Sequence, residues 1–522
     1  MPDAFLGPAA HALDGLLARF ARTHGPFLTP EPARRWGLPG GLVDDALERL
    51  LANGSLLRGE FRPGGAEREW CDPDVLRLLR RRSLARLRRE VEPVDPVALA
   101  RFLPAWQGVV PVAGPGAEAP PYRGGAALER LAEVVDQLAG VAIPASVLER
   151  DVLPSRLPGY QPRLLDELGA MGEVGWIGRG SLGRDDGRIA LFRPGRDALR
   201  PPAPDVADGT ERPVGERHDR IRDHLAGRGA SFYREIHAAA GGGSDRDMLD
   251  ALWDLVWAGE VTNDTFAPLR ALRWKRPAGG GSGGARRPRP GRLTALGPPE
   301  AAGRWSLVGT PAVTTATERL HAQALALLER HGVLTREAVA TEGVDGGFSA
   351  VYPVLRALED AGRIRRGYFV DGLGAAQFAL AGALDRLRAS RDTAADVVVH
   401  LLAAADPANP YGAALSWPRR DDADRRPYQR AAGAYVVLVD GVATLYLERG
   451  GATLQTLPAF DDPELAGPSI RGLGALVATG RLRDLVVRKV DGLPVAESPN
   501  RGRLLDAGFV AGYRGLTLRG AR

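Results

Sequence analysis

The stretch LVDDALERLLANGSLLRGEF, residues 42–61, carries the pattern that decides the fold. Its apolar residues between 42 and 50 recur at three- and four-residue spacing, which places them on one face of a helix. Asn53-Gly54 then ends the helix, because both residue types accept the backbone conformation that follows a helix C-terminus. The apolar run that starts at Leu56 predicts a strand. The stretch therefore specifies a helix, a tight stop and a strand.

The flanking residues extend this unit to a winged helix. Helical spacing predicts a helix over 11–23, and Thr29-Pro30 has the form of a helix N-cap followed by proline at the first helical position. Beyond the quoted stretch, Pro63-Gly64-Gly65 predicts a turn, and residues 67–71 predict a second strand. A helix pair followed by a β-hairpin is the winged-helix arrangement, which we predict over residues 1–95.

The same order of elements returns three times. Each copy closes on a helix end, a glycine and a strand start, as in residues 51–56, 257–261 and 359–364. Repetition at about 90 to 110 residues indicates tandem domains, because solenoid repeats are shorter. The predicted domains are a linker helix and winged helix at 96–200, and winged helices at 210–278 and 304–388. We interpret residues 279–303 as a flexible Gly/Arg/Pro linker, with a strand-binding tether as the alternative.

The pattern changes in residues 392–522. Apolar runs at 397–402, 435–439, 442–448 and 485–490 predict strands, and Asp440-Gly441 predicts a hairpin turn. Helical patterns over 462–479 and 498–507 interrupt these strands. We therefore predict an α+β protein in which tandem winged-helix domains precede a small β-barrel-like domain.

Composition narrows the class of protein further. The net charge is +5, and two of the 69 basic residues are lysines, so the other 67 are arginines. Arginine forks fit phosphates and guanine edges, although a GC-rich genome explains the same bias. The N-terminus carries no basic segment followed by an apolar run, and no apolar stretch is long enough for a membrane helix. We expect a cytoplasmic protein with no membrane partner.

The motifs of several enzyme classes are absent from the sequence. Neither lysine, Lys275 or Lys489, follows the glycines of a phosphate-binding loop, so the chain is not an ATPase on its own. Cys71 is the single cysteine, which excludes a paired-cysteine zinc site and a disulfide within the chain. There is no His-Glu-x-x-His motif and no Gly-x-Ser-x-Gly elbow. We expect no cofactor and no metal.

The predicted wings carry arginines that suit contact with DNA. In a winged helix the second helix of the pair normally enters the major groove, and the wing meets phosphates. The candidates are Arg179 and Arg184 on the second wing, and Arg363, Arg365 and Arg366 on the fourth. The alternative is that these side chains are ordinary solvated surface residues. Single- or double-stranded DNA is the predicted partner.

Several stretches resemble the C-terminal region of the bacterial large helicase-related protein family, Lhr. They are THGPF (23–27), FLPAWQGV (102–109), LPSRL (153–157), LWDLVWAGEVTND (252–264), RGYFV (366–370) and ADPANPYG (405–412). The resemblance implies a layout similar to the AlkZ/YcaQ DNA glycosylases, which combine tandem winged helices with a β-barrel. It also implies uracil-DNA glycosylase activity, a homo-oligomer such as a tetramer, and a helicase partner. This chain lacks the helicase motor, so it is a stand-alone homologue or a fragment of a longer protein.

The same resemblance points to a candidate catalytic site. AlkZ-type enzymes position the attacking water with a Gln-x-Gln motif, and Gln107 falls on its first glutamine while Val109 occupies the second. Trp106 is the candidate base-stacking residue, since a flipped base must be held against an aromatic ring. Asp406 is the second catalytic candidate, as a base. The alternatives are a packed tryptophan at a helix end for Trp106-Gln107, and an Asx turn before Pro407 for Asp406.

Two functions therefore remain after the sequence has been considered. The first is a DNA-repair enzyme, a monofunctional glycosylase that removes uracil or a related damaged base. The second is a non-catalytic DNA-binding or oligomerisation module associated with a helicase. A tandem winged-helix transcription regulator is a weaker third hypothesis, because no effector pocket is visible in the sequence. A cleft lined by Trp106, Gln107 and Asp406 would favour the enzyme.

Overall fold

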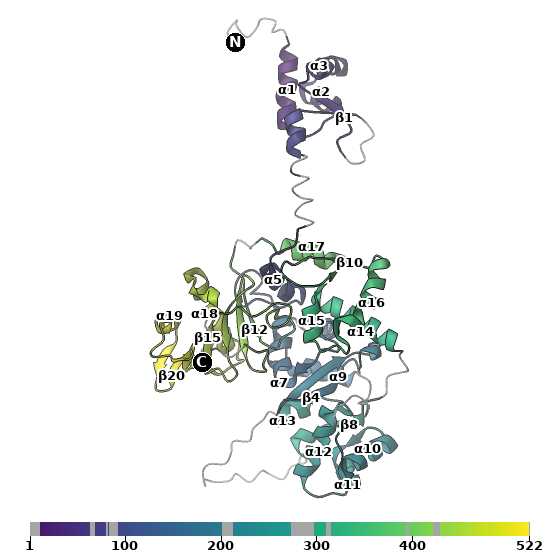
Figure 1. The fold of residues 1–522 in the computed structure, drawn as a ribbon, viewed down its shortest axis with the longest axis vertical. Coiled ribbons are helices and arrows are strands. Elements are labelled where there is room, and N and C mark those ends of the chain that lie inside the picture. The colour runs from purple at the N-terminus through teal and green to yellow at the C-terminus, as the bar shows by residue number, and fades with distance from the viewer. Residues whose placement is uncertain are drawn as a thin grey trace. The chain divides into compact units, whose positions relative to one another are not determined.

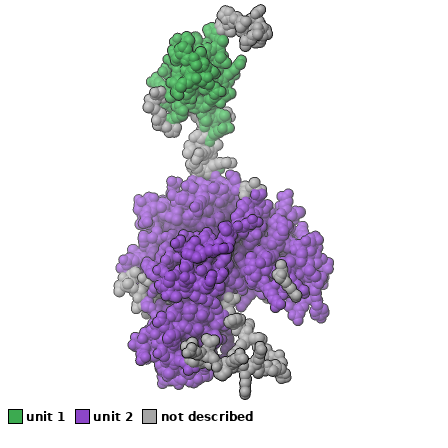
Figure 2. All heavy atoms as spheres, turned by 180° about the vertical axis from the view of Figure 1, so that it is seen from behind, with its two compact units in different colours: residues 1–92 green, residues 93–522 purple. Residues whose placement is uncertain are grey.

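The protein forms two compact units, residues 1–92 and 93–522, which are coloured separately in Figure 2. The computed structural model describes residues 11–62, 68–79, 82, 92–200, 212–272, 297–309, 315–392, 396–420 and 428–520. Within these residues, no helix is both long and apolar enough to cross a membrane.

Unit 1 is a winged helix built on the residues that open the sequence analysis. Its elements are α1 (Ala12–Thr23), α2 (Pro30–Trp36), α3 (Gly40–Ala52), β1 (Leu57–Gly59) and β2 (Glu69–Cys71). The strands pair antiparallel with Leu57 opposite Cys71. Trp70 is only 1% exposed, and its indole N–H donates to Thr29 Oγ1 at 2.9 Å. The turn predicted at 63–65 lies outside the described residues.

The second winged helix begins unit 2, after helix α5 (Pro96–Trp106). Its elements are α6 (Gly125–Gln137), β3 (Ile143–Pro144), α7 (Ala145–Val147), a π-helical turn (Leu148–Val152), α8 (Leu153–Arg156), α9 (Pro162–Ala170), β4 (Gly175–Ser181) and β5 (Gly187–Phe192). The strand order is β3-β5-β4, so β4 and β5 form the wing hairpin. Gly178 lies so close to the third winged helix that an added Cβ would stand 1.9 Å from the Val256 carbonyl oxygen.

The third winged helix is completed by a strand from beyond the predicted linker. Its elements are α10 (Glu216–Arg228), β6 (Ser231–Phe232), α11 (Tyr233–Ala239), α12 (Asp245–Trp257), β7 (Val261–Asn263), α13 (Ala267–Leu272) and β8 (Arg304–Leu307). The sheet order is β6-β8-β7. Assigning residues 304–307 to the fourth domain was therefore wrong, because Trp305 pairs with both Ser231 and Asn263.

The fourth winged helix repeats the same sheet topology. Its elements are α14 (Ala316–His331), β9 (Val333–Leu334), α15 (Arg336–Thr341), α16 (Gly347–Asp360), β10 (Ile364–Gly367) and β11 (Gln377–Leu380), followed by α17 (Ala381–Ala389). The strand order is β10-β11-β9, so the short strand between the first two helices again pairs with the last strand. A capping box at Thr315 and Glu318 starts α14, as both side chains accept from backbone N–H groups.

The described residues of the C-terminal domain form two sheets and two α-helices. A six-stranded sheet has the order β12-β13-β14-β15-β17-β18, and a smaller sheet has the order β16-β20-β19. The bounds are β12 (Val399–Ala403), β13 (Tyr435–Val439), β14 (Val442–Leu447), β15 (Thr453–Thr456), α18 (Pro463–Ala478), β16 (Asp484–Val487), β17 (Lys489–Val490), β18 (Leu493–Pro494), α19 (Arg501–Asp506), β19 (Val510–Gly512) and β20 (Gly515–Arg519).

The six-stranded sheet is open, which differs from the predicted β-barrel. Among the described residues, its end strands β12 and β18 do not pair with each other. The sheet is instead covered on both faces, which explains why β13 is apolar throughout. Val437 and Val439 lie in one apolar core with α18, whereas Val436 and Leu438 lie in another with α5 and the fourth winged helix. The rest of the fold prediction, an α+β protein of tandem winged helices, is confirmed (Figure 1).

Buried Arg330 fixes the fourth winged helix to the second within unit 2. Its Nη1 donates to the carbonyl oxygen of Gln137, the last residue of α6, at 3.1 Å and to that of Ala139 at 3.0 Å. Its Nε and Nη2 donate to the two carboxylate oxygens of Glu342, at 2.7 and 2.8 Å. Arg330 is 3% exposed, and all three of its guanidinium nitrogens donate hydrogen bonds that hold the two domains together.

The position of β8 leads to a stability prediction. Trp305 is fully buried, and its ring meets that of Trp253 edge to face at 5.6 Å. We expect Trp305→Ala to reduce the free energy of unfolding by about 3–5 kcal/mol, the usual cost of removing a buried tryptophan. Hydrogen exchange should show lost protection in α12 and unchanged protection in α14. Val214→Ala, at an exposed residue, is the control. Loss of protection in α14 alone would contradict the strand assignment.

Candidate functional site

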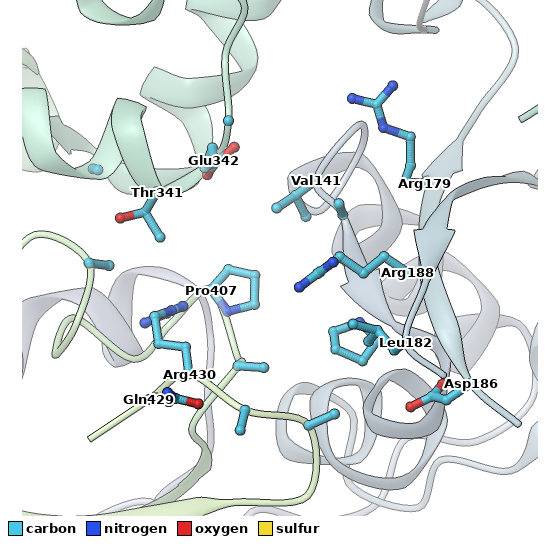
Figure 3. A pocket seen from close by; sticks show the side chains of 18 of the residues that line it. Val141, Arg179, Leu182, Asp186, Arg188, Thr341, Glu342, Pro407, Gln429 and Arg430 are labelled. Carbon is cyan, nitrogen blue, oxygen red and sulfur yellow. The ribbon is translucent and has the colours of Figure 1, made fainter. Parts of the chain in front are cut away.

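A groove opens in unit 2 between the second winged helix, the fourth winged helix and the C-terminal domain. Its larger part has a volume of about 770 Å³ and its smaller part about 520 Å³. Leu182, Asp186, Ala432 and Arg449 line both parts, so the two are continuous. Figure 3 shows the larger part, with side chains from the β4–β5 wing facing those of the 407–430 region and of α15.

Arginine is the main charged residue type along this groove. Arg179, Arg188, Arg430 and Arg449 line the larger part, and Arg150, Arg184 and Arg449 the smaller. Among the described residues, Arg179, Arg184, Arg188 and Arg449 form no side-chain hydrogen bond and no ion pair. Elsewhere in unit 2, Arg222, Arg270 and Arg330 are each held by carboxylates. The groove therefore presents positive charge that the protein does not neutralise.

Burial makes it costly for two of the groove arginines to hold their positive charge. Desolvation lowers the pKa of Arg179, against a weaker opposing effect of Asp345. Desolvation likewise lowers the pKa of Arg430 to about 10, although Asp406 and Glu342 act to raise it. Within the described part of the chain, the Arg430 guanidinium donates to carbonyl oxygens alone, those of Asn409, Tyr411 and Asp406. An anion entering the groove would relieve the cost of holding these cations away from water.

Three carboxylates among the described residues line the groove, and each has a different environment. Burial acts to raise the pKa of Glu342, but Arg330 and His331 outweigh it and lower the pKa to about 2. Asp186 Oδ1 accepts from the backbone N–H of Ser146 at 3.1 Å and of Gly187 at 3.0 Å. Asp185 is exposed and, within the described part of the chain, forms no hydrogen bond or ion pair.

The wall of the groove at Ala405 and Pro407 rests on a fully buried ion pair. Arg156, at the end of α8, donates to both carboxylate oxygens of Asp406, at 2.6 and 3.0 Å, and both side chains are 0% exposed. The same Nη2 of Arg156 donates to Gln107 Oε1 at 2.7 Å. Gln107 Nε2 in turn donates to the Arg330 carbonyl oxygen at 3.2 Å. This network joins α5, the second and fourth winged helices and the C-terminal domain.

The structure thus brings Gln107 and Asp406 together, but beneath the groove and not on its surface. Neither residue lines either part of the groove. Asp406 Oδ1 also accepts from the Ala408 backbone N–H at 2.8 Å, which is the Asx turn considered from the sequence. Trp106 is part-buried beside Phe102 with ring centroids 5.5 Å apart, and its N–H donates to the Glu329 carbonyl at 2.8 Å. Because Gln107 and Asp406 are both 0% exposed, these three residues do not together line an open cleft as expected.

The predicted DNA-contacting arginines separate into two groups. Arg179 and Arg184, on the second wing, line the groove. Arg363, Arg365 and Arg366 are exposed on the fourth wing and do not line it. Arg366 also donates a hydrogen bond to the Tyr352 hydroxyl, and its Nε forms an ion pair with Glu359 Oε2 at 3.2 Å.

Sequence reasoning missed four residues that define the groove and its support. Arg188 is on the same wing hairpin as Arg179 and Arg184, so the expectation that wing arginines contact phosphates could have found it. Arg430 and Arg449 follow no motif, because they reach the groove only through the fold of the C-terminal domain. Arg156 lies inside the LPSRL stretch already singled out, but no local pattern shows that it pairs with a residue 250 positions away.

Two segments of the chain match a described family. Residues 94–194 and 313–399 each match the winged-helix domain of the large helicase-related protein. These ranges contain the second and fourth winged helices, the two that contribute to the groove. The fold and these matches together define a tandem winged-helix protein.

More narrowly, the chain resembles the C-terminal region of large helicase-related proteins. It is 42% identical over 541 residues to a Mycolicibacterium smegmatis protein named "Lhr helicase/ probable uracil glycosylase". It is 35% identical over 547 residues to an Escherichia coli K12 protein named "Lhr helicase/uracil glycosylase". Each match covers 99% of this chain, whereas the chain spans 34% of each relative. The resemblance predicted from the sequence is confirmed.

The buried ion pair leads to a second stability prediction. We expect Asp406→Ala to lower the free energy of unfolding by about 3–5 kcal/mol, because it leaves the Arg156 charge buried and unpaired. Glu48→Ala removes the exposed Arg58–Glu48 pair and should cost less than about 1 kcal/mol. Urea denaturation followed by circular dichroism measures both. If Asp406→Ala costs no more than Glu48→Ala, the ion pair does not support the groove.

Proposed function

We propose that this protein binds DNA in the groove of unit 2 and removes uracil or a related damaged base from it. The observation that carries the proposal is the row of unneutralised arginines, Arg179, Arg184, Arg188 and Arg449, along a groove shared by three domains. DNA supplies one negative charge per phosphate, and arginine binds phosphate oxygens with two parallel hydrogen bonds.

The size and chemistry of the larger part of the groove suit an extruded nucleotide. A volume of about 770 Å³ is within the range of small-molecule sites. Val141, Pro144, Leu182 and Pro407 provide apolar surface beside the arginines. Enzymes that act on a base take it out of the stack and hold it between apolar or aromatic side chains. The names of both relatives include uracil glycosylase, which supports base excision as the chemistry.

The sequence-based hypothesis for Gln107, Asp406 and Trp106 takes a modified form in this proposal. Because Arg156 holds Gln107 and Asp406 beneath the groove, we propose that they position the 405–407 wall and do not touch substrate. Trp106, whose ring faces the Arg386 guanidinium at 5.5 Å, is proposed to support α5 and not to stack on a base. Arg363, Arg365 and Arg366 are proposed to meet phosphates outside the groove.

One observation favours the alternative function, a non-catalytic DNA-binding or oligomerisation module. The residue matched to the water-positioning glutamine, Gln107, is fully buried and hydrogen-bonded at both ends of its amide. It cannot orient a water molecule on a bound sugar. The alternative retains DNA binding but not base release. A homo-oligomer and a helicase partner, which the resemblance implies, are likewise proposals for this chain.

Binding should depend on salt and on the groove arginines. With about five phosphates neutralised, we expect the logarithm of the binding constant to fall against the logarithm of salt with a slope of about −4. Replacing Arg188 and Arg449 together by alanine should flatten that slope by about 1–2. Fluorescence anisotropy with a labelled oligonucleotide, titrated at several salt concentrations, measures this.

The matched control is Arg514→Ala, since Arg514 is exposed and distant in sequence from the groove. It should leave both affinity and slope unchanged. A double variant of Arg363 and Arg365 measures the share of the fourth wing. If that variant abolishes the salt dependence and the Arg188/Arg449 variant does not, DNA binds at the fourth wing and not in the groove.

Base release should occur without added nucleotide. We expect the purified chain to remove uracil from an oligonucleotide with a single uracil, leaving an abasic site that alkali cleaves. The product is measured on a denaturing gel, and an oligonucleotide with thymine at the same position is the control. Tight, salt-dependent binding without any base release from uracil or alkylated DNA would favour the non-catalytic module.

A further inference from the structure

We infer that Asp186 is the catalytic carboxylate of the groove, the group that accepts a proton from the water attacking the sugar. The inference rests on the proposed base-excision function and assigns a residue to its chemical step. Asp186 lies at the end of the wing hairpin that carries Arg184 and Arg188, and it lines both parts of the groove (Figure 3).

The Asp186 side chain is held at one oxygen only. Oδ1 accepts from the backbone N–H groups of Ser146, at the start of α7, and of Gly187, at the start of β5. Oδ2 forms no hydrogen bond with any described residue, and the side chain is part-exposed in the groove. A carboxylate fixed in this way offers one oriented, uncommitted oxygen, which is the geometry that a general base needs.

The backbone at Asp186 is also fixed from the opposite side. Leu182 N–H donates to the Asp186 carbonyl oxygen at 2.8 Å, which closes the wing hairpin. Gly187 packs against Trp257 so closely that an added Cβ would lie 2.5 Å from the indole ring. The third winged helix thus holds the hairpin at the residue next to Asp186. Small displacements of a catalytic group are costly, so such support matters for catalysis.

The other carboxylates near the groove are less suited to this role. Both oxygens of Glu342 are bound by Arg330, and one also by His331, so its charge is neutralised within the protein. Asp185 is exposed at the hairpin tip and lacks the two backbone contacts that fix Asp186. Asp406 is fully buried under Arg156. Among the described groove residues, Asp186 alone is both fixed and uncommitted.

The surrounding arginines complement this role without cancelling it. Arg188 and Arg449 line the larger part of the groove with Asp186, and Arg150 and Arg184 line the smaller part. None of the four forms an ion pair with Asp186 in the described structure. Phosphates bound to these arginines would place the sugar of the flipped nucleotide beside the carboxylate.

The proposed step conserves atoms and charge. The bond between C1′ of the deoxyribose and N1 of uracil breaks, and its electron pair leaves with N1. Asp186 stabilises the cationic sugar that forms. The oxygen of a water molecule then bonds to C1′ while one of its protons passes to Asp186 Oδ2. That proton neutralises the departing uracil anion through solvent, leaving an abasic site and free uracil.

Asp186→Asn gives a sharp test. The amide oxygen can still accept from the N–H groups of Ser146 and Gly187, while the second atom becomes an NH₂ group that cannot take a proton. We expect the single-turnover rate of uracil release to fall by about 10²- to 10⁴-fold, the usual contribution of a general base. The melting temperature and the DNA affinity should stay close to those of the wild type. Asp185→Asn removes the same charge one residue away within the groove, so it measures how much of the effect is due to groove charge alone. Asp506→Asn, at an exposed residue outside the groove lining, is the control and should retain the full rate.

The outcomes separate this inference from the function on which it rests. If the wild type releases uracil and Asp186→Asn does so at the same rate, Asp186 is not the base and the proposed function stands. If Asp185→Asn slows release as much as Asp186→Asn, the effect is one of groove charge, and the assignment fails. If the wild type releases no base, the proposed function and the assignment fail together, whatever the DNA affinity. Loss of activity confined to Asp186→Asn, with binding and folding retained, supports the assignment.

Discussion

The buried pair of Arg156 and Asp406 is the interaction on which the groove depends. Burying a guanidinium and a carboxylate is costly unless the two charges are paired and hydrogen-bonded, and both terminal nitrogens of Arg156 are bound, by Asp406, Gln107 and the Val152 carbonyl. The pair fastens α8 of the second winged helix to the segment that follows β12, the first strand of the C-terminal domain. Gln107 extends the contact to the fourth winged helix through the Arg330 carbonyl. Three domains are therefore fixed around one point, directly below the groove.

Arginines in unit 2 serve two different purposes, which their partners distinguish. Those at domain contacts are saturated: Arg330 holds two carbonyls and a carboxylate, and Arg270 bridges Glu149 and Asp166. Along the groove, Arg179, Arg184, Arg188 and Arg449 have no carboxylate partner among the described residues, and desolvation lowers the pKa of Arg179 and Arg430 there. Uncompensated positive charge in a partly enclosed space costs stability unless an anion enters. The contrast supports a nucleic-acid backbone as the occupant.

Much of the candidate site could be predicted from the sequence, but not the part each residue plays. The expectation that wing arginines contact DNA identified Arg179 and Arg184, because a β-hairpin after two helices projects its side chains outward. Resemblance found Gln107 and Asp406, and the structure places them in one network. Their burial could not be foreseen, because it follows from Arg156, whose partner lies 250 residues further along the chain. Local patterns also cannot single out Asp186, since the free oxygen is visible only when its backbone donors are known.

The sequence by itself determined the local elements and their repetition. Helical spacing, glycine stops and alternating apolar runs specify the four winged helices, since these signals arise between residues a few positions apart. Only the tertiary structure decided what is built between the domains. It showed that β8, which follows residues 273–296 in the sequence, belongs to the third winged helix. It also showed that the six-stranded sheet is open and that three domains together form the groove. Such features depend on contacts between distant residues, whose strength is set by packing and burial that no local stretch of sequence records.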